Sequence, residues 1–149
     1  MEQREKRILV VDDDDAIRAL LFTILRRRGF RVDSARNGVE ALGRCERCRY
    51  SLVVLDLMMP RMSGYQVLHE IETWRVEDRP FIIVLTAGNE PRNVSADLVG
   101  GTVRKPFDIE MLVEMMTACL STKEMAEQLA ECPPAESEQP PPADSEKAN

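Results

Sequence analysis

Residues that can carry out chemistry follow four of the apolar runs in this sequence. Asp12 and Asp13 come directly after the run RILVV, and Asp56 comes directly after LVVL. Thr86 follows FIIVL, and Lys105 follows a weaker run. If these runs form parallel strands, their carboxyl ends share one edge of a sheet, which is where such sheets bind ligands. The pattern therefore predicts a site made of three carboxylates, one hydroxyl and one ammonium group.

Three carboxylates at one edge repel one another, and this repulsion raises the pKa of at least one of them. A hard divalent cation removes the conflict, and Mg²⁺ is suited to it because it takes one or two carboxylates, a backbone oxygen and several waters. An aspartate beside Mg²⁺ can attack phosphorus and form an acyl phosphate. Asp56 is the expected nucleophile because it follows the central strand alone, and Thr86 and Lys105 would hold the phosphoryl oxygens. For any one of these acids alone, a solvated turn or a helix cap is the plain alternative.

The elements that must position these side chains can be located from hydrophobic pattern. Five runs rich in β-branched residues are expected to form strands, namely Arg7–Val11, Arg31–Ala35, Leu52–Leu55, Phe81–Leu85 and a weak one at Thr102–Arg104. Their apolar residues are largely continuous rather than alternating, which indicates strands that are buried on both faces, as in a parallel sheet.

Segments with helical spacing of apolar residues separate these runs. The expected inner faces are Ile17, Leu20, Leu21, Ile24 and Leu25; then Val39, Leu42 and Cys45; then Gly64, Val67, Leu68 and Ile71; and finally Ile109, Leu112, Val113 and Met116. Asp14 or Asp15 can cap the first helix, and Asp108 can cap the last. Between Leu85 and Thr102 at most two helical turns fit, so the fourth helix is expected to be shortened. The alternation predicts an α/β fold with helices on both faces of the sheet.

The 149 residues are enough for one ordinary domain, and 44% of them are hydrophobic, which is sufficient for a core. After the expected last helix, Ser121–Glu124 has the spacing of a capping box, so residues 121–130 form either a short extra helix or an extension of that helix. Residues 131–149 are rich in Pro, Glu, Ser and Ala without periodicity, which predicts a disordered acidic tail. Residues 1–6 are expected to be a short N-terminal tail, leaving no residues for an effector domain.

The net charge of −6 is concentrated at the end of the chain. Residues 131–149 contain five acids and one lysine, or −4, so the first 130 residues carry about −2. Such a balance gives no electrostatic reason to bind nucleic acid or an anionic membrane. The basic cluster Arg26–Arg28 is expected to place cations at a helix C-terminus, with a binding patch as the alternative.

The sequence also gives an expectation of compartment and of thiol chemistry. No apolar run approaches the ~18 residues of a membrane span, and the first residues lack the apolar stretch of a signal peptide, so a cytoplasmic protein with reduced cysteines is expected. Cys45 and Cys48 have the spacing of metal ligands, but neither a second pair nor a histidine cluster accompanies them. We expect them to be two incidental thiols.

Four segments, ILVVDDDDAIR, LVVLDLMMPRMSG, VLTA and VRKPF, resemble in order and spacing the receiver domain of two-component response regulators. The resemblance covers residues 7–120 and is strongest around Asp56. It implies a CheY-like, flavodoxin-like sheet of five parallel strands in the order 2-1-3-4-5. It also implies that the phosphoryl donor is a phosphohistidine on a sensor histidine kinase or on a histidine phosphotransfer protein.

The same resemblance assigns roles to individual residues. Asp56 would be the phosphoacceptor, and Mg²⁺ would be bound by Asp13, Asp56 and the main-chain carbonyl of Met58. Asp12, the other member of the acid pair, would act on the metal largely through water. The resemblance further implies that Thr86 and Lys105 bind the phosphoryl oxygens, and that a cis peptide bond joins Lys105 to Pro106.

Three departures from the family pattern concern the surface that usually transmits the signal. Thr102 stands at the switch position, where most receivers have a tyrosine or phenylalanine ring that moves inward. The stretch from Thr86 to Lys105 is a few residues shorter than usual. Gly100 and Gly101 replace the acidic pair that is usual before the fifth strand. The expected phosphorylation chemistry is therefore complete, whereas the output surface is expected to be remodelled.

These observations favour a stand-alone, phosphorylation-controlled module that signals by protein contact. One alternative is a hydrolase that uses an aspartyl-phosphate intermediate. Such enzymes carry a second aspartate two residues after the nucleophile, and Met58 occupies that position here, so no turnover enzyme is expected. The other alternative is a phosphorylation-independent pseudo-receiver scaffold, which the absence of a ring at Thr102 keeps open.

Overall fold

The structure, a computed structural model, describes residues 6–88 and 98–130. Its strands are β1 (Arg7–Val11), β2 (Arg31–Ala35), β3 (Leu52–Asp56), β4 (Phe81–Thr86) and β5 (Gly101–Arg104). Its helices are α1 (Asp15–Arg27), α2 (Gly38–Arg47), α3 (Gly64–Glu72) and α4 (Ile109–Ala130), with a 3₁₀ turn at Val76–Asp78. No helix within these described ranges is long and apolar enough to cross a lipid bilayer.

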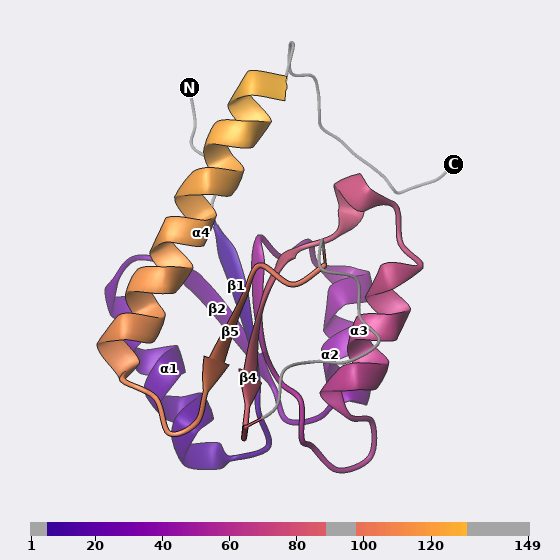
Figure 1. Cartoon of the computed structure of the whole chain (residues 1–149), viewed down its shortest axis with the longest axis vertical. Helices are drawn as coiled ribbons and strands as arrows, with labels where there is room; N and C mark the ends of the chain where they lie inside the picture. The colour runs from indigo at the N-terminus through magenta and orange to yellow at the C-terminus, as the bar shows by residue number, and fades with distance from the viewer. Residues whose placement is uncertain (1–5, 89–97, 131–149) are drawn as a thin grey trace.

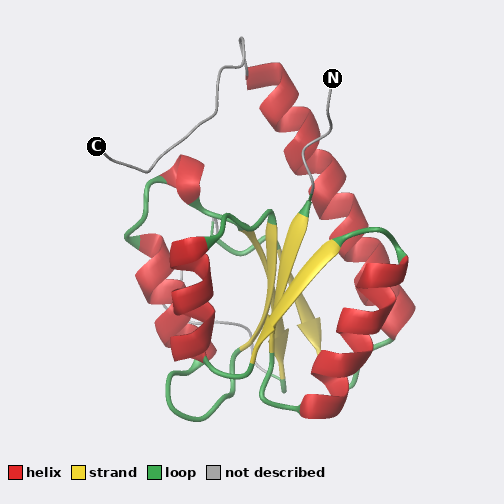
Figure 2. Ribbon diagram, turned by 180° about the vertical axis from the view of Figure 1, so that it is seen from behind, coloured by secondary structure: helices red, strands yellow, loops and turns green. Residues whose placement is uncertain are grey.

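The strands form one parallel sheet in the order β2-β1-β3-β4-β5, which confirms the predicted topology. Helices α1 and α4 cover one face of this sheet, and α2 and α3 cover the other (Figures 1 and 2). Successive residues of β1 alternate between two core clusters, with Ile8 and Val10 on the α1/α4 side and Leu9 and Val11 on the α2/α3 side. Because both faces are covered, every one of these positions is apolar, which explains the continuous runs in the sequence.

Two apolar residues expected on inner helix faces are exposed instead. The exposed fraction of Leu20 is 49% and that of Val39 is 48%. In α1 the buried contacts are made by Leu21 and Leu25, which leaves Leu20 at the margin of the helix face. In α2 the buried residues are Gly38, which lies directly against Met62, and Ala41, whereas Val39 lies outside this buried face.

Helix boundaries agree with the expected capping residues. The side chain of Asp14 accepts hydrogen bonds from the backbone N–H groups of Ala16 and Ile17 at the start of α1. Asp108 accepts from the N–H groups of Glu110 and Met111 at the start of α4. Helix α4 continues without interruption to Ala130, so residues 121–130 extend the last helix and do not form a separate one. The shortened helix expected between Leu85 and Thr102 falls largely on residues 89–97, which lie outside the described ranges. The tail expected at residues 131–149 lies outside them as well.

Gly64, the first residue of α3, allows the loop after β3 to return closely against the sheet. A Cβ atom at this position would lie 2.4 Å from the carbonyl oxygen of Asp56 and 2.7 Å from Cα of Leu57. The N–H group of Gly64 also donates to the carbonyl oxygen of Leu57 at 3.0 Å. Any side chain here would push α3 away from the end of β3, where Asp56 lies.

We predict that Gly64→Ala destabilises the protein by about 1–3 kcal/mol or more, because the contacting atoms are backbone and cannot move aside. Gly43→Ala is the matched control, since the nearest atom to its new Cβ would be 4.0 Å away at the end of the Arg47 side chain. In the interior of α2 that control should stabilise by about 0.5–1 kcal/mol. Urea midpoints measure both effects, and equal midpoints for Gly64→Ala and wild type would contradict the close approach.

Candidate functional site

The strand ends bring all five predicted side chains to the carboxyl edge of the sheet. Asp12 follows β1, and its N–H donates to the carbonyl oxygen of Ala35 at 3.2 Å. Asp56 is the last residue of β3, and Thr86 is the last residue of β4. Lys105 follows β5, and its N–H donates to the carbonyl oxygen of Thr86 at 2.8 Å. The parallel register therefore gathers these groups from four separate segments of the chain.

Three carboxylates meet at this edge. Asp12, Asp13 and Asp56 each offer an oxygen that lies within 4.8 Å of the others. Asp12 and Asp56 are buried, with exposed fractions of 0% and 2%, whereas Asp13 is exposed. The cluster is thus closed beneath by the sheet and open to solvent on the side of Asp13.

Lys105 supplies the positive charge at the bottom of this cluster. Its Nζ atom lies 3.1 Å from Oδ2 of Asp12 and 3.3 Å from Oδ2 of Asp56. The peptide bond between Lys105 and Pro106 is cis, as the resemblance implied. One ammonium group therefore bridges the two buried carboxylates.

The other oxygen of each buried carboxylate is held by the backbone of its own loop. Oδ1 of Asp12 accepts from the N–H of Asp14 at 2.9 Å, and Oδ1 of Asp56 accepts from the N–H of Met58 at 3.1 Å. Both are short-range side chain-to-backbone bonds between a residue and the second one after it, which are typical of aspartate in turns. They fix the carboxylates so that both Oδ2 atoms lie toward Lys105.

Burial and like charge shift the titration of this site. Burial and, after it, the nearby charge of Asp12 raise the pKa of Asp56 to about 6, although the N–H of Met58 and the charge of Lys105 oppose the rise. For Lys105, burial lowers the pKa, but contacts with Asp12 and Asp56 outweigh it and hold the pKa above its usual value. Both shifts have the direction expected of a cluster that has too little positive charge.

The residues present fit a hard divalent cation. Oδ2 of Asp12 is buried and has no well-formed hydrogen bond among the described residues, although it forms an ion pair with Nζ of Lys105. Two buried carboxylates and one exposed carboxylate face a single ammonium group, so the donor set is all oxygen and negatively charged, which is what Mg²⁺ prefers. The side chain of Met58 is 66% exposed and does not fill the site; the contribution of its carbonyl stays a prediction.

Two further predicted residues are Thr86, which lies at the edge of this site, and Thr102, which lies outside it. Oγ1 of Thr86 accepts from the N–H of Gly88 at 3.3 Å, and the residue is buried. Thr102 is exposed on β5, where it pairs with Val84, so the switch position presents no ring to the site.

Sequence reasoning missed one residue that supports the site, Arg18 in the first turn of α1. Its Nη1 atom donates to the carbonyl oxygen of Asp12 at 2.9 Å, and its Nη2 atom pairs with Asp15. The spacing of three residues between Asp15 and Arg18 was visible in the sequence as a helical ion pair. The bond back to Asp12 depends on the angle at which α1 leaves β1, which no local pattern reveals.

The Cys45 and Cys48 side chains lie away from this edge, at the end of α2. Burial raises the pKa of the Cys45 thiol to about 11, with smaller contributions from the neighbouring Cys48 and Glu46. Sγ of Cys48 lies 3.9 Å from Nη1 of Arg7. The described cysteines are all free, and a thiol with this pKa stays protonated and unreactive near neutral pH.

We predict that Asp56→Asn stabilises the metal-free protein more at pH 7.5 than at pH 4.5. The folded-state pKa of about 6 exceeds the ordinary value of 3.8, so the folded state binds the proton more tightly and loses stability as the pH rises through this interval. At roughly 1.4 kcal/mol per pKa unit, the gain at pH 7.5 is bounded by about 3 kcal/mol.

Urea unfolding in EDTA at both pH values measures this difference. Glu70→Gln, which removes an exposed carboxylate on α3, is the control and should give equal changes at the two pH values. A pH-independent effect of Asp56→Asn would show that burial does not penalise its charge.

Comparison with known proteins assigns a family to this geometry. The family model of the response regulator receiver domain matches residues 8–117. The response regulator MprA of Mycobacterium sp. (strain KMS) is 42% identical over 117 residues, which are 76% of this chain and 50% of that protein. The transcriptional regulatory protein ResD of Bacillus subtilis is 38% identical over 122 residues, 80% of this chain and 50% of that protein. The chain thus spans about half the length of the curated relatives it matches.

Solved structures give the same result. A CheY-like receiver domain protein from Methanospirillum hungatei has a TM-score of 0.75 at 28% identity, covering 83% of this chain and 99% of that one. The response regulator TrrA from Thermotoga maritima, solved in complex with Mg²⁺-BeF, has a TM-score of 0.67 at 39% identity, covering 76% and 98%. With the predicted sheet order present and its strand-end acids gathered around one lysine, the chain belongs to the receiver domain family of two-component response regulators.

Proposed function

We propose that this receiver accepts a phosphoryl group on Asp56 in a Mg²⁺-dependent reaction and signals through contact with another protein. The observation that carries the proposal is the position of Asp56, a buried carboxylate at the end of the central strand with Lys105 3.3 Å away and two further acids beside it. Receiver domains receive their phosphoryl group from histidine kinases or phosphotransfer proteins, and we propose a donor of this kind here, in the cytoplasm.

Each residue has a task in this reaction. Asp12, Asp13 and Asp56 would hold Mg²⁺ together with the carbonyl of Met58, and the metal, when bound, supplies charge that offsets the phosphoryl oxygens. The Oδ2 atom of Asp56 is the side that attacks, since Oδ1 is occupied by the N–H of Met58. Lys105 is already placed to pair with a phosphoryl oxygen on Oδ2, and the hydroxyl of Thr86 can donate to another.

The structure also offers a route by which a change at Thr86 would reach the rest of the molecule. The carbonyl of Thr86 accepts a hydrogen bond from the N–H of Lys105, and Nη2 of Arg104 donates to the carbonyl of Gly88 at 2.9 Å. Any movement of Thr86 toward a phosphoryl group would therefore be transmitted through the backbone to the end of β5. This route requires no ring at Thr102.

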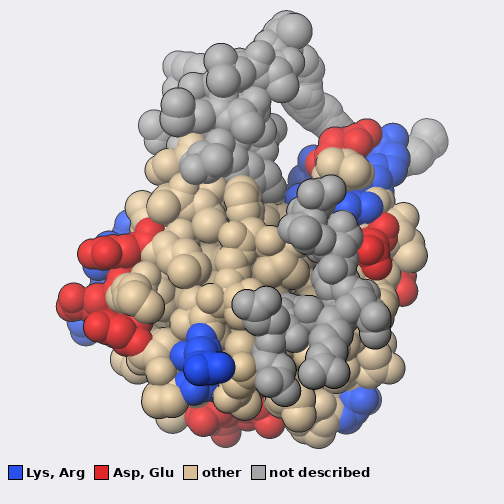
Figure 3. Space-filling model, viewed as in Figure 1, with Lys and Arg blue, Asp and Glu red and all other residues tan. Residues whose placement is uncertain are grey.

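The surface around β5 supports an output by protein contact. Gly100 lies directly against the ring of Phe81, so a Cβ atom there would be 2.1 Å from Cε1, and a Cβ on Gly101 would be 3.1 Å from the sulfur of Met115. Figure 3 shows a broad area with few charges over β5 and the adjoining part of α4, where the side chain of Met111 is 53% exposed. This packing explains the glycine pair, and it supports a readout surface that differs from the usual one.

Phosphorylation can be tested on the intact chain with acetyl phosphate and Mg²⁺. We expect mass spectrometry to show the gain of one phosphoryl group, which EDTA prevents and Asp56→Asn abolishes. Asp14→Asn is the matched control, because it removes a neighbouring carboxylate while asparagine still caps α1, and it should label like the wild type.

The same reaction separates the alternatives. We propose that the protein is not a turnover enzyme, so phosphate release from assorted phosphate esters should stay at background; sustained release would indicate a hydrolase. A wild-type chain that gains no phosphoryl group under conditions that label another receiver would contradict the proposal and favour a phosphorylation-independent scaffold.

A further inference from the structure

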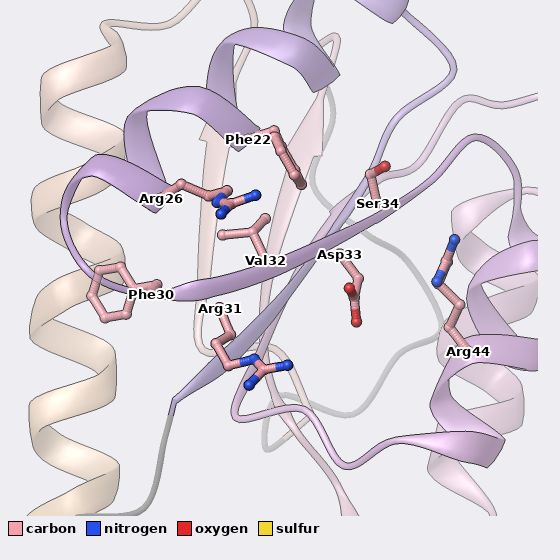
Figure 4. A pocket seen from close by; sticks show the side chains of 8 residues that line it. All are labelled: Phe22, Arg26, Phe30, Arg31, Val32, Asp33, Ser34 and Arg44. Atoms are coloured by element: carbon pink, nitrogen blue, oxygen red, sulfur yellow. The ribbon is translucent and has the colours of Figure 1, made fainter.

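A groove of about 600 Å³ lies along the free edge of the sheet, over β2 and between α1 and α2 (Figure 4). It contains none of the residues of the aspartate site. Its walls combine the aromatic rings of Phe22 and Phe30 with three arginines, Arg26 from α1, Arg31 from β2 and Arg44 from α2. The groove therefore has both apolar surface and positive charge.

The positive charge of the groove is not balanced by its own acid. Asp33 is the one carboxylate that lines it, and that carboxylate already accepts a hydrogen bond from the hydroxyl of Tyr50 at 2.6 Å and pairs with Arg7 at 3.4 Å. Arg26 lies over the ring of Phe22, 5.5 Å from the ring centroid. Among the described residues, neither Arg26 nor Arg44 forms an ion pair, and these two guanidinium groups favour an anionic ligand.

Arg44 gives an independent indication of a missing partner. Its side chain leaves α2 toward β2, as Figure 4 shows, and its Nε atom is buried without a hydrogen-bond partner among the described residues. A buried N–H group without an acceptor is costly, because it has lost water and gained nothing in return. A carboxylate or carbonyl oxygen placed in the groove could supply that acceptor.

The edge strand offers backbone groups as well. β2 pairs with β1, and the bonds from Arg31 N–H to Lys6 and from Asp12 N–H to the carbonyl of Ala35 fix the alternation of its backbone. In a parallel pair this alternation directs the N–H and C=O groups of Val32 and Ser34 away from β1. An extended peptide can bind to such an edge.

We propose that the groove binds the acidic, proline-rich segment 131–149 of the same chain. This segment carries five acids and one lysine, so its charge is complementary to Arg26 and Arg44. Its proline-free stretch 135–139 contains Glu136 and Glu138 and can still donate backbone N–H groups to an edge strand.

The position of the segment allows this contact. Helix α4 ends at Ala130, and its residue Leu120 belongs to the same core cluster as Phe30, at the margin of the groove. Nineteen extended residues reach up to roughly 60 Å, which exceeds the span of a body of this size, about 35 Å across. The segment can therefore cross from the end of α4 to β2 without strain.

The test compares backbone amide NMR spectra of the full-length chain and a full-length variant in which Glu131, Glu136, Glu138, Asp144 and Glu146 are changed to the corresponding amides. We expect the amides of Val32, Ser34 and Arg44 to shift between the two, while those of β3 do not. The difference should persist on tenfold dilution, as an intramolecular contact requires. Identical groove spectra in the two proteins would overturn the proposal, and a dilution-dependent difference would assign the contact to a second copy instead.

A reciprocal experiment uses the arginines. A synthetic peptide of residues 131–149 is titrated into the amide variant, where it should reproduce the lost shifts. Arg26→Gln combined with Arg44→Gln should weaken peptide binding roughly tenfold or more, because two charge-assisted contacts are removed. Arg27→Gln combined with Arg47→Gln removes the same charge from the same two helices outside the groove, and it should have little effect. Equal weakening by both pairs would show nonspecific attraction and contradict the proposal.

Discussion

The contact of one lysine with two buried carboxylates is the constraint on which the rest of this structure depends. Asp12 and Asp56 are desolvated by the same sheet that forms the core, and their charges oppose each other at the ends of adjacent strands. Lys105 follows the last strand of the sheet, and its Nζ atom lies within 3.3 Å of an oxygen of each aspartate. The fold must therefore close from β1 to the turn after β5 before either aspartate finds its counter-charge, and the raised pKa of Asp56 shows that one lysine does not compensate fully.

The backbone around this contact holds Asp12 and Asp56 in place. Gly64 brings the loop after β3 onto Asp56, and Arg18 draws the start of α1 onto the carbonyl of Asp12. Backbone N–H groups hold the Oδ1 atoms of Asp12 and Asp56, so both Oδ2 atoms lie toward Lys105. Positioning by backbone is inexpensive in conformational entropy, because those groups are already ordered by the strands that precede them.

Features of this structure that depend on local sequence patterns could be predicted from the sequence, whereas features that depend on how separate elements pack could not. The convergence of Asp12, Asp56 and Lys105 was predicted from apolar runs and the residues that follow them, which are local signals, whereas the strand order was implied by the resemblance to receiver domains. Leu20 and Val39 were wrongly placed inside, because periodicity gives the direction of a helix face but not its width or the distance to its neighbour. For α2 that distance is set by Met62, a residue more than twenty positions away, so no window centred on the helix could have contained it. The hydrogen bond from Arg18 to the carbonyl of Asp12 was missed for a different reason: the two residues are only six positions apart, but the bond depends on the angle at which α1 leaves β1.

The aspartate site and the surface around β5 can change independently because different interactions hold them in place. At the carboxyl edge, charge and desolvation leave little freedom, because Asp12 and Asp56 share the ammonium group of Lys105 and loss of that lysine would leave two buried carboxylates without their counter-charge. Around β5 the constraint is packing alone: the ring of Phe81 occupies the space that a side chain at position 100 would need, and Thr102 is exposed. A surface fixed only by packing can accept a new partner by changing two or three residues without disturbing Asp56. The N–H of Lys105 donates to the carbonyl of Thr86, and the side chain of Arg104 donates to the carbonyl of Gly88, and these two hydrogen bonds keep such a surface connected to the site.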